Sequence, residues 1–114
     1  MLFEKILNQI NLLEMSNIRP AETGLNMVIY IGPQYGLKHG PRIKVSTKYG
    51  EKVGATFFTI TIANEPVVIG KTGDIKSEDI DQVKEFVKLN KNVLLKLWND
   101  EISPADAVNK FVRV

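Results

Sequence analysis

Residues 27–69 read MVIYIGPQYGLKHGPRIKVSTKYGEKVGATFFTITIANEPVVI, and this stretch decides the fold. Its β-forming residues gather in four runs separated by turns of glycine, proline and asparagine, which predicts strands at residues 25–31, 42–48, 55–63 and 67–69. The connections between the last three strands are short, so these strands should pair antiparallel as a meander. The loop at residues 33–41 holds two prolines and two glycines, and a loop of that length in a small sheet often has a function.

Cations and aliphatic residues alternate in the second predicted strand, in the order Arg42, Ile43, Lys44, Val45. Strand side chains point to the two faces of a sheet in turn, so the two aliphatic residues should be buried and the two cations exposed on the opposite face. With regular pairing, Phe57 of the next strand lies on the same side as the cations. Either the N-terminal segment covers that face or a partner binds it.

Helical patterns flank the predicted sheet on both sides. The N-terminal stretch, residues 2–15, carries an apolar stripe at helical spacing made of Leu2, Phe3, Ile6, Ile10 and Leu13. Charges inside this stretch, and the lack of a small-residue cleavage site after it, distinguish it from a signal peptide. We therefore expect an amphipathic helix of the mature protein at residues 2–15, followed by a short polar linker to Gly24.

The last third of the chain is predicted to be helical from residue 77 to residue 111. Ser77 is a plausible N-cap before an acidic first turn, and the asparagines of residues 89–92 mark where this helix could divide in two. Ser103 and Pro104 start a further short helix. The predicted fold class is α+β: one domain over residues 1–114, with a four-stranded, mainly antiparallel sheet, C-terminal helices on one face and the N-terminal helix as an accessory.

Composition limits the function classes. The chain has 114 residues, 44% of them apolar and 25% charged, which is typical of a globular protein. It has no cysteine and one histidine, so we expect no thiolate site, no transition metal and no cofactor. No apolar run approaches the roughly 18–20 residues that span a bilayer, and a cytoplasmic location without membrane contact is expected.

Positive charge gathers in one part of the chain. Residues 16–52 carry six cations against two anions, whereas residues 73–114 carry seven against eight. The candidate binding residues are the cations and aromatic residues around the second predicted strand: Tyr35, Lys38, His39, Arg42, Lys44, Lys48 and Tyr49. Cations beside aromatic rings suit phosphate contact and base stacking. The alternative is a strand face that lysine keeps soluble and free of aggregation.

The order of these elements resembles a family of small bacterial proteins of unknown function. The similarity covers residues 27–98: a His-x-Pro element at residues 39–41, a short basic strand, a strand ending near Gly70, an acidic helix, and Asn90 followed by Leu94-Leu95-x-x-Trp98. The usual signature of that family is His-Ala-Pro-Pro-His-Phe-His-Val, and its members are often suspected to belong to toxin–antitoxin pairs. The resemblance implies a similar role here.

This chain departs from that signature where it matters chemically. Aligned on the proline and the final valine, residues 41–45 read Pro-Arg-Ile-Lys-Val, so Arg42 and Lys44 replace the two downstream histidines. Neither residue is a ready metal ligand or a proton shuttle at neutral pH, so a metal or acid–base role of those histidines does not carry over. At these two positions, only positive charge on the strand is retained from the family signature.

These patterns favour a non-enzymatic binding module, of toxin–antitoxin or prophage type, that engages nucleic acid or a partner protein through the basic strand and the loop before it. One alternative is a metal-independent ribonuclease-like toxin, in which His39 is the general acid and Arg42 and Lys44 stabilise the charge of the transition state. Another is a self-associating interaction domain, a homodimer for example, that pairs through the N-terminal helix.

Overall fold

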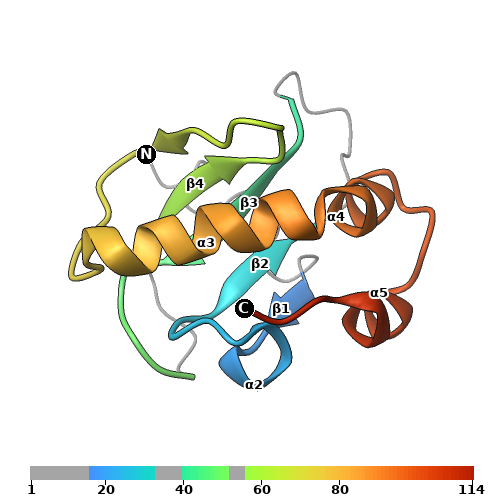
Figure 1. Cartoon of the computed structure of the whole chain (residues 1–114), viewed down its shortest axis with the longest axis horizontal. Helices are drawn as coiled ribbons and strands as arrows, with labels where there is room; N and C mark the ends of the chain where they lie inside the picture. Colours follow the sequence, from blue (N-terminus) through green and yellow to red (C-terminus); the bar gives the residue numbers. More distant parts are fainter. Residues whose placement is uncertain (1–15, 33–39, 52–55) are drawn as a thin grey trace, which may run out of the picture.

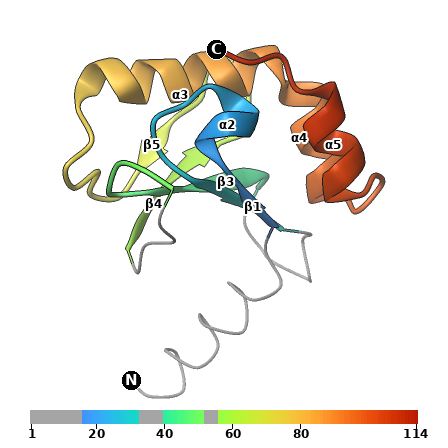
Figure 2. The same cartoon turned by 90° about the horizontal axis from the view of Figure 1, so that it is seen from below.

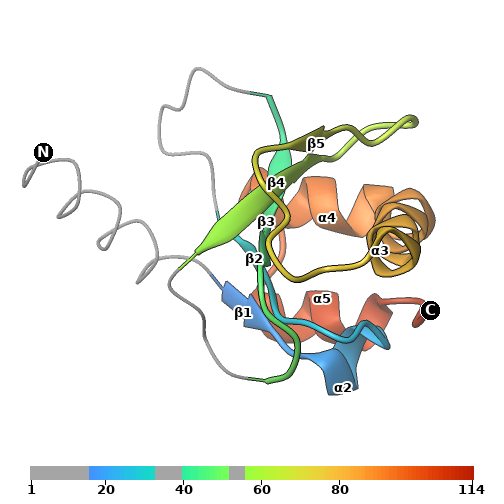
Figure 3. The same cartoon turned by 90° about the vertical axis from the view of Figure 1, so that its left-hand side faces the viewer.

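The computed structural model describes residues 16–32, 40–51 and 56–114. These residues form one sheet with helices packed against one of its faces (Figures 1 and 3). In chain order the elements are β1 (Ser16–Ile18), α2 (Pro20–Thr23), β2 (Ile29–Ile31), β3 (Arg42–Ser46), β4 (Phe57–Thr61), β5 (Val68–Ile69), α3 (Ser77–Leu89), α4 (Lys91–Trp98) and α5 (Pro104–Lys110). The predicted α+β class is confirmed. The helix predicted at residues 2–15 lies outside the described residues.

The sheet has five strands in the order β1-β2-β3-β4-β5, and every neighbouring pair is antiparallel. The predicted meander is confirmed, but the predicted count of four strands is wrong. The extra strand, β1, lies in the segment expected to be a linker. It is only three residues long, and its pairing with β2 buries Ile18 to 1% exposure. Long-range pairing, not a local pattern, therefore makes this strand.

The same expected linker also contains the short helix α2. Pro20 is its first residue, where a missing N–H costs nothing. The side chain of Glu22 accepts a hydrogen bond from the backbone nitrogen of Arg19 (3.1 Å), and Gly24 ends the helix with a φ of 84°. Arg19-Pro20 thus starts a turn of helix inside the segment that was predicted to be a polar linker.

The buried face of the sheet follows the predicted period of two. Ile43 and Val45 of β3 are both 0% exposed, and they pair with Ile60 and Phe58 of β4. Helices α3 and α4 cover this face (Figures 1 and 3). Their buried side chains are Val83, Phe86, Val87, Leu94, Leu97 and Trp98. The predicted burial of Ile43 and Val45 is therefore confirmed.

All four predicted strands are shorter in the structure, and β4 and β5 cover only Phe57–Thr61 and Val68–Ile69 of the predicted 55–63 and 67–69. For β3 and β2 the structure shows a local reason. Strand β3 ends at Ser46 and not at residue 48, because the Ser46 hydroxyl bonds to the backbone oxygen and nitrogen of Lys48 (3.1 and 3.2 Å) and turns the chain. Strand β2 begins at Ile29 and not at residue 25. Before it, Met27 makes only an isolated bridge to Gly50.

The predicted helix break at residues 89–92 is confirmed, since α3 ends at Leu89 and α4 begins at Lys91. Asn90 lies between them and is 2% exposed. Its Nδ2 donates to the backbone oxygens of Val112 (2.9 Å) and Phe86 (3.0 Å), and its Oδ1 accepts from the backbone nitrogen of Val112 (2.8 Å). The side chain therefore fastens the segment after α5 to the junction of α3 and α4.

Of the two predicted helix starts, the one of α5 is confirmed and the N-cap predicted for α3 is wrong. Ser103 caps α5, accepting a hydrogen bond from the Asp106 nitrogen (3.1 Å). The N-cap of α3 is Lys76 and not Ser77, which is the first helical residue.

Within the part of the chain that the structure describes, no helix is long and apolar enough to cross a bilayer.

Candidate functional site

The second face of the sheet points away from the described helices, as the edge-on views of Figures 2 and 3 show. We call it the outer face. The cross-strand register assigns to it the side chains of Asn17, Tyr30, Arg42, Lys44, Ser46, Phe57, Thr59, Thr61 and Ile69. None of these residues is acidic, and the two charged ones are Arg42 and Lys44.

Lys44 lies at the centre of a row that crosses all five strands. The register pairs Asn17 with Tyr30, Tyr30 with Lys44, Lys44 with Thr59, and Thr59 with Ile69. Directly opposite residues on one face are close neighbours, with Cβ atoms about 4.5–5.5 Å apart. The Lys44 side chain therefore rises between those of Tyr30 and Thr59.

This position explains a difference from the sequence prediction. Arg42 and Lys44 were expected to be exposed, but both are partly buried. Their strand β3 is the central one, so side chains of β2 and β4 flank them on both sides. The burial lowers the pKa of Lys44 below its ordinary value, and the positive charge of nearby Arg42 lowers it further.

Within the described residues, neither cation has a carboxylate partner. The described residues contain one ion pair, between Arg19 Nε just before α2 and Glu22 Oε1 within α2, at 3.4 Å. Arg42 Nε donates to the backbone oxygen of Gly40 (3.3 Å), which turns its guanidinium toward the end of β3. Two neighbouring cations, one of them partly desolvated, create a local positive potential that an anion would relieve.

An aromatic pair lies beside the cations. Phe57 is on the outer face, on the same side as Arg42 and Lys44, as the sequence predicted. Its ring packs edge-to-face with that of Tyr30, with centroids 4.8 Å apart and planes at 78°. The sequence did not assign Tyr30 to this face, because every residue from 27 to 31 is apolar or aromatic and shows no alternation. The pairing of Tyr30 with Lys44 supplies that assignment.

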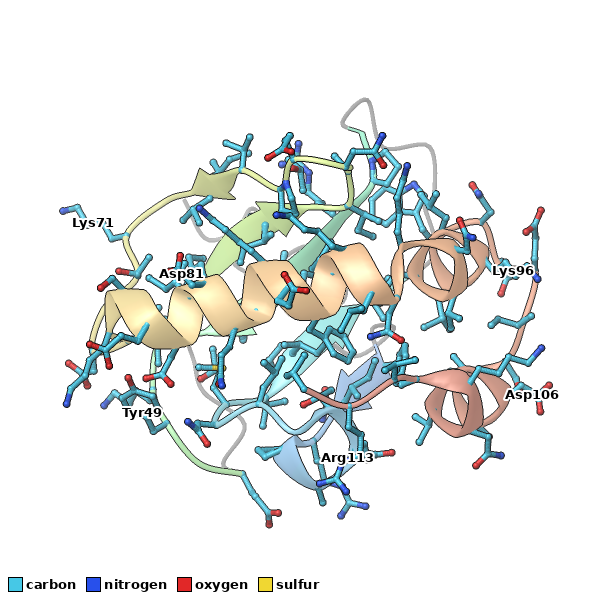
Figure 4. The ribbon with its side chains drawn as sticks, in the orientation of Figure 1. Tyr49, Lys71, Asp81, Lys96, Asp106 and Arg113 are labelled. Carbon is cyan, nitrogen blue, oxygen red and sulfur yellow. The ribbon has the colours of Figure 1, made fainter. Side chains whose placement is uncertain are left out.

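The other candidate residues are not all brought together. Lys48 is exposed beyond the end of β3. Tyr49 bonds to the start of α3, on the helix side of the sheet (Figure 4): its hydroxyl donates to Asp79 Oδ2 (2.5 Å) and accepts from the Lys76 nitrogen (2.9 Å). Tyr49 thus ties the β3–β4 connection to α3 and lies apart from the cations. Tyr35, Lys38 and His39 lie outside the described residues.

The Tyr49 contact predicts a pH dependence of stability. The hydrogen bond to Asp79 raises the Tyr49 pKa above its ordinary value of 10.0, because that bond needs the phenol proton. The stability that the neutral phenol contributes is therefore complete below about pH 10 and is lost as the pH rises through the raised folded pKa. We expect the urea midpoint of the parent to fall as the pH rises above about 10. Tyr49→Phe should show a smaller fall, and equal falls in the two proteins would contradict this role.

The described part of the chain contains no cluster of three or more histidine, cysteine or acidic side chains that could hold a metal ion. No protein-family model, curated protein or solved structure matches the chain. The resemblance to the small bacterial family therefore stays a prediction. What distinguishes the outer face chemically is its pair of adjacent cations beside an aromatic pair.

Proposed function

We propose that this chain is a small binding module, without a reaction of its own, that holds nucleic acid against the outer face of its sheet. The single observation behind the proposal is the position of Arg42 and Lys44 on one face that carries no acidic strand residue. Following the family resemblance, we place the module among toxin–antitoxin or prophage proteins.

The physical chemistry of the pair favours phosphate. Residues two apart on a strand lie about 6.6–6.8 Å from each other on the same face, so the two cations can approach separate phosphates of one strand. A phosphate next to Lys44 would offset the cost of its partial burial and of its repulsion by Arg42. Each contact would also release counterions from the nucleic acid.

The ribonuclease-like alternative depends on a proton donor that titrates near neutral pH. No such side chain lies among the outer-face residues of the described strands. His39, the single histidine, falls in residues 33–39 and lies outside the description. Because Arg42 and Lys44 can attract a phosphate without any proton transfer, binding alone is the simpler function.

A test of the proposal compares two double variants with the same change in net charge. Arg42→Gln/Lys44→Gln removes the outer-face cations, and Lys88→Gln/Lys96→Gln removes two exposed cations of α3 and α4 on the other side of the sheet (Lys96 is labelled in Figure 4). The probe is a labelled oligonucleotide of mixed sequence, titrated at several salt concentrations. The first variant should lower the slope of log K against log salt by about 1.4–1.8, because each phosphate contact contributes about 0.7–0.9.

The control variant should keep the parental slope to within about 0.3, since long-range charge alone contributes little at moderate salt. An equal loss in both variants would mean that net charge, and not the outer face, drives binding. If the parent binds neither DNA nor RNA at low salt, the proposal is wrong.

A further inference from the structure

We infer that the nucleic acid held by the outer face is single-stranded and runs along β3, with phosphates on Arg42 and Lys44 and a base stacked on Phe57. The inference deepens the proposed function and depends on it. It comes from the placement of the cations on the central strand and from the aromatic ring one diagonal step away.

The width of the sheet argues against a duplex. A row of five residues crosses the sheet through Lys44, with two strands on each side of β3. Strands lie about 4.8 Å apart, so the five strands span about 19 Å. The major groove of B-form DNA is about 12 Å wide and admits a helix or a two-stranded ribbon. The five strands would meet the phosphate backbones of a duplex before any side chain of the outer face reached a base, so a duplex could offer phosphates to Arg42 and Lys44 but no base to Phe57.

A single strand has no such barrier, because it lies on the surface and turns its bases toward it. Phe57 pairs with Ser46 in the register, whereas Lys44 pairs with Thr59, so Phe57 and Lys44 are diagonal neighbours. Diagonal neighbours in an antiparallel pair are about 7–8 Å apart. One nucleotide covers that span, with its base and its phosphate on opposite sides of the sugar.

The ring of Phe57 is held in place and is still partly accessible. Tyr30 of β2 packs against it edge-to-face over the intervening strand β3, with ring centroids 4.8 Å apart, and Tyr30 itself is 1% exposed. Phe57 is only partly buried. A fixed, accessible aromatic ring beside cations suits base stacking, which accepts any base because every base has a π-face.

The test uses 12-nucleotide oligo-U and oligo-dT as single-stranded probes and a 12-base-pair hairpin as the duplex. Phe57→Leu keeps an apolar side chain but removes the ring. It should weaken single-strand binding about 5- to 100-fold. Its salt slope should stay that of the parent, because no charge is lost. The parent should bind the hairpin more weakly than the single strands, and Phe57→Leu should leave that residual affinity unchanged.

Phe57→Trp is the matched variant that keeps a stacking ring. It should retain parental affinity for the single strands, and the new indole should lose fluorescence when they bind but not when the hairpin binds. Trp98 is 4% exposed in the core and supplies a constant background. If Phe57→Leu fails to fold, as its melting curve will show, Phe57→Trp decides alone.

The outcomes separate this inference from the proposed function. Hairpin binding as tight as single-strand binding, with no effect of Phe57→Leu, would overturn the single-strand inference and leave a general phosphate-binding face. Absence of quenching in Phe57→Trp on oligo-U and oligo-dT would overturn the stacking contact. No binding of any probe at low salt would end both.

Discussion

Replacing Asn90 with leucine should lower the free energy of unfolding by about 2–4 kcal/mol and the melting temperature by roughly 8–16 °C. The Asn90 amide satisfies both the backbone nitrogen and the backbone oxygen of Val112 from a position that is 2% exposed. Leucine fills a similar volume but leaves these two groups without their partner. With the bond from Asn90 Nδ2 to the Phe86 oxygen, three hydrogen bonds are lost, and a typical one contributes about 0.5–1.5 kcal/mol. Thermal and urea unfolding measure the loss.

Two further variants show whether hydrogen bonding or shape is responsible. Asn90→Asp keeps the acceptor for the Val112 nitrogen but cannot donate when ionised, so it should also be destabilised. Asn92→Leu changes an exposed asparagine two residues away and should stay within about 0.5 kcal/mol of the parent. If Asn90→Asp were as stable as the parent, packing shape and not hydrogen bonding would hold this junction.

The second large effect is expected at Gly73, where alanine should cost about 2–4 kcal/mol. The φ of Gly73 is 63°, a conformation that costs an L-residue about 1–2 kcal/mol. A Cβ there would also lie 2.6 Å from the Cβ of Thr47 and 2.9 Å from its backbone oxygen. That oxygen accepts a hydrogen bond from the Asp74 nitrogen (3.1 Å), so relief of the clash weakens the contact between the β5–α3 connection and the residue after β3.

Two other glycines separate the contributions. Gly50 has a φ of 98° with no atom within 4 Å of a Cβ, so Gly50→Ala should show the backbone cost alone, about 1–2 kcal/mol. Gly40 has no positive φ and an equally open Cβ position, so Gly40→Ala should be close to neutral. We expect the loss in stability to rise from Gly40 through Gly50 to Gly73. If Gly73→Ala lost no more stability than Gly50→Ala, Thr47 would have to move aside without cost.

Local patterns in the sequence predicted much of this fold because the responsible residues act locally. The alternation at residues 42–45 predicted which face each side chain takes, and the break at Asn90 was visible as two poor helix formers. Strand β1 could not be predicted in this way. Three residues carry no periodic signal, and only pairing with β2 makes them a strand.

The same difference between local patterns and long-range contacts applies to the residues of the candidate site. The period of two placed Arg42, Lys44 and Phe57 on one face, and the structure confirms that placement. Tyr49 lay beside the same strand in sequence, but its hydroxyl bonds to Asp79, thirty residues further along the chain. Contacts at that separation are set by how α3 packs on the sheet, which no local pattern contains. Partial burial of Lys44 likewise follows from β3 being central.

Strand β5 lies at one edge of the sheet, where a strand of a second molecule could pair with it. Thr61 donates its backbone N–H to the Val67 oxygen (3.0 Å), and its hydroxyl accepts the Val67 N–H (2.9 Å). The backbone of Val67 and, by alternation, that of Ile69 therefore face β4, and only Pro66 and Val68 face outward within residues 66–69. Proline has no N–H to offer. This edge thus gives a second strand little to pair with, so crowding of the folded protein should not propagate the sheet from β5 into fibres.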